Sequence, residues 1–100
     1  MKEVTASELK QMVDFHEDFQ LIDVREPWEV EEVSIGGLNI PMGSAIQRAD
    51  EISKDKKVVV HCKAGMRSAS VIQALEQKLG YTNLYNLQGG IMAYLNEIKP

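Results

Sequence analysis

The fold is decided in the stretch VVVHCKAGMRSASV, which runs from Val58 to Val71. Its three leading valines form an apolar β-branched run that is too short for a helix and typical of a central parallel strand. Beyond the bend, apolar residues recur at helical spacing, at Val71, Ile72, Leu75 and Leu79. This spacing predicts a helix that ends at Gly80. The single cysteine of the chain, Cys62, therefore lies at the bend between a buried strand and a helix.

Strand-like and helix-like segments alternate along the rest of the sequence. Short apolar runs predict further strands at residues 19–24, 38–40 and 83–87. Helices are expected after the capping box at Thr5–Glu8, from Pro27, over Ala45–Ile52 and after Gly89–Gly90. This alternation predicts an α/β fold with a mainly parallel sheet. The sequence has no internal repeat or long linker, so we expect one domain over residues 1–100.

Composition and charge exclude several classes of function. The chain has 44% hydrophobic and 26% charged residues and a net charge of -4, with no basic run for nucleic acid. No apolar run approaches the roughly 20 residues that span a bilayer, and MKEVTASELK lacks the apolar core of a secretory signal. One cysteine cannot form an internal disulfide. We therefore expect a cytoplasmic protein, or a mature chain whose signal was removed, without contact to membrane or nucleic acid.

The position of Cys62 favours a reactive thiol. Unpaired amides at a helix start carry partial positive charge, and those of residues 64–67 can converge above the sulfur if the loop curls. Gly65 most easily adopts the backbone angles of such a curl. Lys63 and Arg67 add positive charge, so the pKa of Cys62 should fall and an anionic substrate should bind beside it. The alternative is a cysteine that packs as a small hydrophobe, and the spacing alone leaves both interpretations open.

The segment Cys62-Lys63-Ala64-Gly65-Met66-Arg67-Ser68 resembles the active loop of the rhodanese (sulfurtransferase) family, C-x-x-G-x-R-S. Residues 21–43 resemble the first half of that family, with a D-V-R-E segment and an N-I-P strand, and residues 81–94 resemble its closing strand, Gly-Gly turn and last helix. The match covers nearly all of the chain in the right order. The chain departs from the family at residues 33–38, where many members have Gly-His-Ile-Pro-Gly-Ala, and at Tyr94, where many have tryptophan.

This resemblance implies a small rhodanese-like domain with helices on both faces of the sheet, and catalysis of double displacement. Cys62 would attack the outer sulfur of a small anionic donor such as thiosulfate, carry a persulfide, and pass that sulfur to a thiol, cyanide or a protein acceptor. The residues implied in substrate binding follow Cys62 directly: Lys63, Ala64, Gly65, Met66, Arg67 and Ser68. The reaction needs no metal or other cofactor, and we expect a monomer.

Other polar residues have less defined roles in the sequence. Asp23 and Arg25 end the first long strand, where they can shape the site or form a structural ion pair, and we favour the ion pair. His61 should point to the sheet face opposite Cys62, as a packed and hydrogen-bonded residue. Ser68 can donate a hydrogen bond to sulfur or cap the helix that starts near it, and we favour the cap.

Two rival functions share this sequence pattern. Cysteine phosphatases and arsenate reductases use a similar strand, loop and helix, but their loop is C-x5-R, whereas four residues separate Cys62 from Arg67 here. The shorter loop suits a single sulfur better than a tetrahedral oxyanion. The second rival is a persulfide relay or docking module for a partner enzyme. The presence of Cys62 argues against a purely structural docking role.

Overall fold

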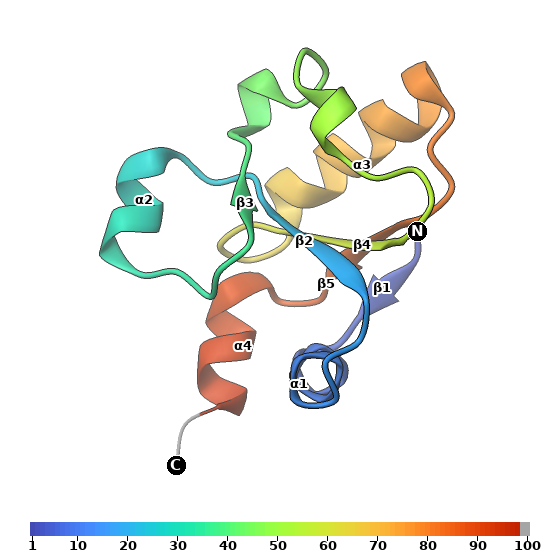
Figure 1. The fold of residues 1–100 in the computed structure, drawn as a ribbon. Coiled ribbons are helices and arrows are strands. Elements are labelled where there is room, and N and C mark those ends of the chain that lie inside the picture. The colour runs from blue at the N-terminus through green and yellow to red at the C-terminus, as the bar shows by residue number, and fades with distance from the viewer. Residues whose placement is uncertain (99–100) are drawn as a thin grey trace.

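The computed structural model describes residues 1–98, and in these residues five parallel strands form one sheet in the order β1-β5-β4-β2-β3 (Figure 1). The strands are β1 (Glu3–Val4), β2 (Phe19–Asp23), β3 (Leu38–Asn39), β4 (Lys57–His61) and β5 (Leu84–Leu87). The helices are α1 (Ala6–Asp14), α2 (Pro27–Glu32), α3 (Met66–Leu79) and α4 (Gly90–Glu97). Two short 3-10 helices, η1 (Met42–Ser44) and η2 (Ala49–Glu51), precede β4.

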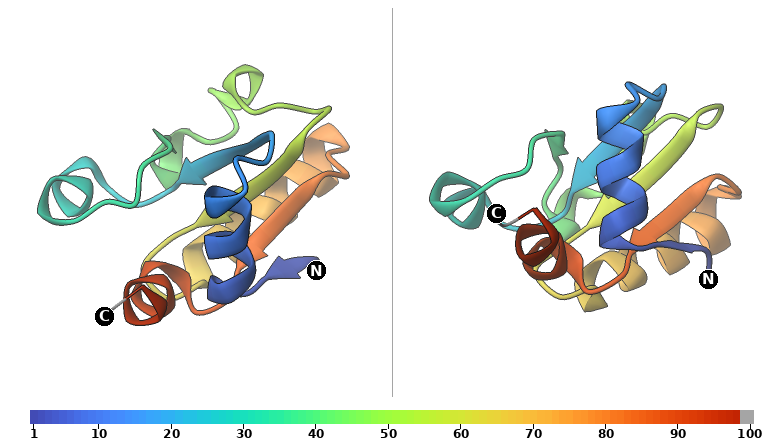
Figure 2. Two further views of the ribbon diagram at one scale, coloured as in Figure 1. Left: turned by 60° about the horizontal axis from the view of Figure 1, so that its bottom comes forward. Right: turned by 90° about the horizontal axis from the view of Figure 1, so that it is seen from below.

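Strand β4 is the centre of the sheet because its valines are buried on both faces. Val58 and Val60 pack on one face with the apolar side of α3, and Val59 packs on the other with α1 and α4. Figure 2 shows α3 on one side of the sheet and the pair α1 and α4 on the other. The predicted α/β class, parallel sheet and helices on both faces are confirmed.

The prediction of one helix over Ala45–Ile52 is wrong. The structure has only the 3-10 helix η2 in this span. The carbonyls of Ala49 and Ile52 accept hydrogen bonds from the buried Tyr81 hydroxyl, at 2.7 and 3.0 Å. A single short helix gains little on its own. Burial of its apolar side chains against α3 and this tyrosine therefore sets the shape of the segment. Strand β1 is not predicted from the sequence either, because two residues are too few to show the alternation of apolar and polar side chains that is typical of a strand.

All five strands run in the same direction, so their carboxyl ends meet at one edge of the sheet. Asp23 at the end of β2 lies in register with His61 at the end of β4. The cysteine loop follows β4 directly, and the turn into α2 follows β2. Ligand sites of open parallel sheets lie at this edge. Among residues 1–98, no helix combines the length and the apolar character that crossing a bilayer requires.

Candidate active site

The cysteine loop is a tight turn between β4 and α3. Gly65 is the residue that precedes the first turn of α3, and its φ of 111° lies in the left-handed region that favours glycine. The helix begins at Met66, two residues earlier than predicted, so Ser68 stands inside the first turn and does not cap it. The expected cap at Ser68 is therefore wrong. Because Gly65 takes the left-handed conformation, the chain turns into the helix without a side-chain cap.

This turn places several hydrogen-bond donors around the Cys62 sulfur. The Gly65 amide donates to Sγ at 3.1 Å, and the Ser68 Oγ lies 3.4 Å from Sγ. Burial raises the pKa of the Cys62 thiol. Hydrogen bonds from the Ser68 hydroxyl and from the amides of Ser68, Gly65 and Ala64 together outweigh burial, so the pKa lies below its ordinary value. The side chain is only 1% exposed, so any reagent must reach the sulfur through the mouth of the loop.

The loop is supported from below by α4 and β5. The first amides of α4 donate to loop carbonyls, Ile91 to Cys62 at 2.9 Å and Met92 to Lys63 at 3.2 Å. From β5, the Asn86 side chain donates to the Gly65 carbonyl at 3.0 Å and accepts a hydrogen bond from the Ser68 hydroxyl. Sequence analysis missed Asn86. Its only signal was a polar residue within an apolar strand pattern.

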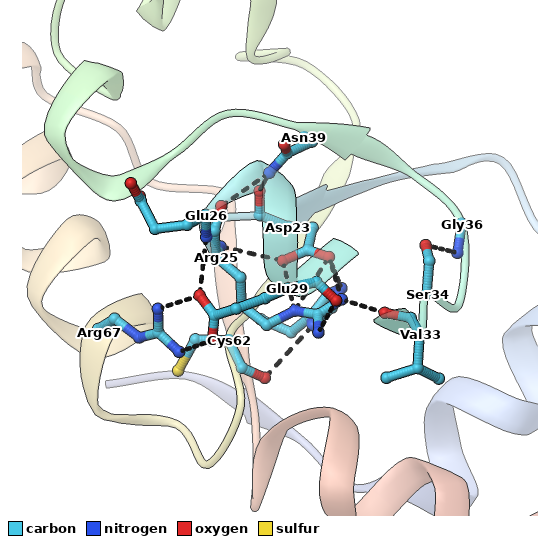
Figure 3. Close-up of polar contacts among 11 residues, drawn as sticks. Asp23, Arg25, Glu26, Glu29, Val33, Ser34, Gly36, Asn39, Cys62 and Arg67 are labelled. Carbon is cyan, nitrogen blue, oxygen red and sulfur yellow. Dashed lines mark hydrogen bonds and ion pairs between the residues drawn. The ribbon is translucent and has the colours of Figure 1, made fainter. Parts of the chain in front are cut away.

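Arg67 does not extend alone over the sulfur. Its guanidinium makes two hydrogen bonds to the Glu29 carboxylate, at 2.7 and 2.9 Å, beside the Cys62 side chain (Figure 3). The Arg67 hydrogen bonds, together with the amide of Glu26, hold the pKa of Glu29 at about 2. The acidic run from Glu26 to Glu32 predicts a solvated helix face for Glu29. The structure instead brings it from α2 to the mouth of the cysteine loop, where it offsets the charge of Arg67.

Asp23 and Arg25 form a buried ion pair, with Nη2 of the arginine 2.8 Å from the aspartate Oδ2. The same guanidinium donates to the carbonyls of Glu29 and Val33, at 3.3 and 2.8 Å. These contacts attach α2 and the turn after it to the end of β2 (Figure 3). The ion pair therefore helps to hold α2, and with it the Glu29 side chain, beside the cysteine loop.

His61 is fully buried, as the sequence predicted. Its Nδ1 lies 3.4 Å from the Cys62 carbonyl oxygen, and its Nε2 lies 3.7 Å from Asp23 Oδ2. Within residues 1–98, Nε2 has no hydrogen-bond partner. Burial lowers the pKa of His61, which favours the neutral ring at pH 7. The described residues contain no cluster of His, Cys, Asp or Glu that could hold a metal ion.

The remaining loop residues form the rim of the site. Lys63, Ala64 and Met66 are exposed, and Met66 is the most exposed apolar residue of the loop, at 82%. Next to the loop, between α2 and α4, lies a cavity of about 150 Å³, whose lining includes Trp28, Met92 and Lys63. The predicted binding residues thus divide into two groups. Gly65 and Ser68 face the sulfur, while the others surround its entrance.

A comparison with known families identifies the chain. The model of the rhodanese-like domain matches residues 5–97. The chain belongs to the rhodanese family. It is 38% identical to the putative sulfurtransferase YtwF of Bacillus subtilis, over 100% of this chain and 96% of that protein. It is 37% identical to a sulfurtransferase of Allochromatium vinosum, over 100% of this chain and 94% of that protein.

Solved structures give the same assignment. A crystal structure of a rhodanese-related protein from Thermoplasma volcanium superimposes with a TM-score of 0.86 at 32% identity, covering 100% of this chain and 96% of that chain. The rhodanese assignment that the sequence motifs suggested is therefore confirmed over the whole length. The relatives support sulfur transfer as the general activity of this rhodanese domain.

Proposed function

We propose that this rhodanese domain is a sulfurtransferase whose nucleophile is Cys62. In the first step the thiolate attacks the outer sulfur of a donor such as thiosulfate. The S–S bond of the donor breaks, sulfite leaves with the bonding electron pair, and Cys62 becomes a persulfide. In the second step an acceptor nucleophile attacks the outer sulfur of that persulfide. The Cys62 thiolate leaves and is restored, so both steps balance without an oxidant or reductant.

The surroundings of the Cys62 sulfur carry this proposal. A nucleophilic cysteine must be ionised at neutral pH, and the Gly65 amide and Ser68 hydroxyl both stabilise the thiolate. The N-terminus of α3 adds partial positive charge near the Cys62 sulfur. Neighbouring amide groups suit the terminal sulfur of a persulfide for the same reason, because this sulfur also carries negative charge. A free thiol persists in a reducing compartment, so the proposal includes a cytoplasmic location.

The contacts of Arg67 argue against phosphatase or arsenate chemistry. Such enzymes need an arginine that folds over the tetrahedral oxyanion. Here four residues separate Cys62 from Arg67, and the guanidinium is engaged by both oxygens of Glu29. An oxyanion would have to compete with a carboxylate that is ionised at every physiological pH. A sulfur donor whose reacting atom enters the loop depends less on direct binding by this arginine.

A persulfide relay to another protein is the second candidate, and the surface around the mouth favours it. Trp28, Met66 and Met92 are 62%, 82% and 52% exposed. Trp28 belongs to α2, Met66 is the first residue of α3 and Met92 belongs to α4, and these elements surround the entrance. Large exposed apolar side chains at a site entrance suit contact with a protein acceptor. A small acceptor such as cyanide would need none of them.

Intact-protein mass spectrometry tests the first step. Wild-type protein and Cys62→Ser are incubated with thiosulfate and measured before and after treatment with a thiol reductant. Addition of one sulfur atom to wild type alone, reversed by the thiol, is the expected result. Sulfur on the Cys62→Ser variant would remove Cys62 from the mechanism. If wild type gains no sulfur from thiosulfate but gains it from a low-molecular-weight persulfide, thiosulfate is not the donor.

Two acceptor assays separate the candidates. Sulfur loss from the loaded wild-type protein is followed with cyanide and with a thiol-containing protein. The Met66→Ser and Met92→Ser variants are compared with wild type in both assays. A direct transfer enzyme predicts equal rates for wild type and variants with both acceptors. A relay predicts slower transfer only to the protein acceptor.

A further inference from the structure

Asn86 is a buried polar residue in the strand next to the cysteine loop. It is 5% exposed, and its register partner in β4 is Val60. Side chains alternate along a strand, so Asn86 shares with Leu84 the sheet face that packs against α3. A buried amide without partners costs free energy, and this strand position would otherwise suit an apolar residue. The contacts of Asn86 therefore need a reason.

Both ends of the Asn86 amide bind residues that contact the Cys62 sulfur. Its Nδ2 donates to the carbonyl of Gly65 at 3.0 Å, and the amide of Gly65 donates to Sγ at 3.1 Å. Gly65 has few steric limits on its angles, so hydrogen bonds to its carbonyl help to fix the direction of its peptide groups. The Ala69 amide and the Ser68 hydroxyl donate to this carbonyl from within α3, each at 3.2 Å. Asn86 adds a bond from β5, outside the loop and its helix.

The second contact fixes Ser68. The Ser68 Oγ lies 2.5 Å from Asn86 Oδ1 and 3.4 Å from Cys62 Sγ. A hydroxyl has one hydrogen and two lone pairs, so Oγ can donate to Asn86 while it accepts from the Cys62 thiol. After ionisation the same hydrogen can turn to the thiolate. While the thiol is protonated, the hydrogen bond to Asn86 holds Oγ beside the sulfur, so the hydroxyl is in place when the thiolate forms.

We propose that Asn86 is a positioning residue for sulfur transfer, which holds the Gly65 amide and the Ser68 hydroxyl against the sulfur of Cys62. Its role in transfer rests on the proposed function. Its effect on the cysteine itself does not, and it can be measured without a sulfur donor. Removal of Asn86 leaves every charged side chain around the loop in place. These groups are Asp23 and Arg25 from β2 and its end, Glu29 from α2, His61 and Lys63 beside Cys62, and Arg67 from α3.

The matched control for this test is Asn83, the residue before β5. Its side chain also makes two hydrogen bonds, both as the donor, to the carbonyls of Ser53 at 2.8 Å and Lys56 at 2.6 Å. They lie at the opposite end of the sheet, where β4 begins. Asn83→Ala therefore removes a similar set of contacts far from the cysteine loop. A merely structural role for Asn86 predicts the same result for both variants.

The experiment measures the alkylation rate of Cys62 by iodoacetamide between pH 5 and pH 10, for wild type, Asn86→Ala, Asn86→Leu and Asn83→Ala. Thermal unfolding confirms that each variant is folded. Asn86→Leu has a similar volume, adds no charge and suits this apolar face of the sheet, which covers the case in which alanine does not fold. For both Asn86 variants we expect the midpoint of the rate profile to rise by about one pH unit. That shift means about tenfold slower alkylation below the midpoint. Asn83→Ala should keep the wild-type midpoint.

Three outcomes would overturn the proposal. The first is an unchanged midpoint in the folded Asn86 variants. The second is a lower midpoint, which would mean that Asn86 withholds the Ser68 hydrogen from the sulfur. The third is a raised midpoint with unchanged sulfur transfer from thiosulfate, which would remove Asn86 from the reaction. A wild-type protein that takes up no sulfur would overturn the proposed function, and the alkylation profiles would still decide whether Asn86 positions the loop.

Discussion

Replacement of Glu29 by glutamine isolates the charge that faces Arg67 at the mouth of the site. Glu29 makes both hydrogen bonds to the guanidinium and also accepts the amide of Glu26 as part of a capping box. Glutamine also serves at this position of a capping box and can still accept one hydrogen bond from Arg67. The substitution therefore preserves the start of α2 and removes one negative charge. It leaves the positive charge of Arg67 without its partner.

The size of the effect follows from the exposure of the pair. The pKa of Glu29 is about 2, so the carboxylate is fully ionised in any assay near neutral pH. The Arg67 side chain is 34% exposed and that of Glu29 13%, which places the pair at a partly screened surface. Two unit charges about 4 Å apart interact by roughly 1 kcal/mol in water. Release of that charge should therefore strengthen binding of an anionic donor about fivefold.

The assay compares KM for thiosulfate with the alkylation rate of Cys62 by uncharged iodoacetamide, in wild type, Glu29→Gln and Glu31→Gln. Glu31 is exposed on the same helix, so its variant carries the same change in net charge. We expect KM for thiosulfate to fall only in Glu29→Gln, with little change in the alkylation rate and a smaller difference in KM at high salt. Equal KM values for thiosulfate in the two variants would refute the reasoning that Glu29 offsets a charge of Arg67 that the donor would otherwise meet.

Three further predictions concern stability. The free energy of unfolding should decrease as the pH falls below 6.5, because His61 in the unfolded chain binds a proton that the buried ring, with its lowered pKa, does not bind. In a series of urea denaturations at different pH, His61→Gln should reduce this dependence of the free energy of unfolding on pH. Asp23→Asn leaves a buried arginine without its partner and should reduce the free energy of unfolding by about 3–5 kcal/mol in the same assay. Gly90→Ala should reduce stability and sulfur uptake together, because its φ is 62° and a Cβ would meet the cysteine-loop backbone. Gly80→Ala, with a φ of 71° and open space around it, should reduce stability alone.

The fold could be predicted from the sequence because its main signals are local. The capping box of Thr5 and Glu8 is present as predicted, with contacts of 2.8 and 3.1 Å. The helix after the cysteine loop ends at Gly80, in the left-handed conformation expected of a terminal glycine. The three valines from Val58 occupy the central strand. Each of these features depends on residues within a few positions of one another.

The Asp23–Arg25 ion pair and the Gly65 amide at the sulfur are local and were predicted, whereas the contacts of Glu29 and Asn86 could not be predicted because they join distant parts of the chain. Glu29 and Arg67 are 38 positions apart, and Ser68 and Asn86 are 18 apart. The local pattern around Glu29, an acidic helix of six residues, is that of a solvated surface. Its proximity to the loop results from Arg25, which donates to the carbonyl of Glu29 in α2 and to that of Val33 just after it. Spacing along the chain contains no information on such a contact.

The contacts of the cysteine loop separate its chemistry from its selectivity. The groups that lower the pKa of Cys62 are backbone amides and one hydroxyl, all held by the loop and by β5. The groups at the entrance are side chains of α2, α4 and the loop rim, led by Glu29 with Arg67. A substitution at the entrance can therefore change which donor or acceptor enters while the thiolate keeps its pKa. A substitution at Asn86 or Gly65 should instead impair transfer with every donor and acceptor alike, because the sulfur itself loses its hydrogen bonds.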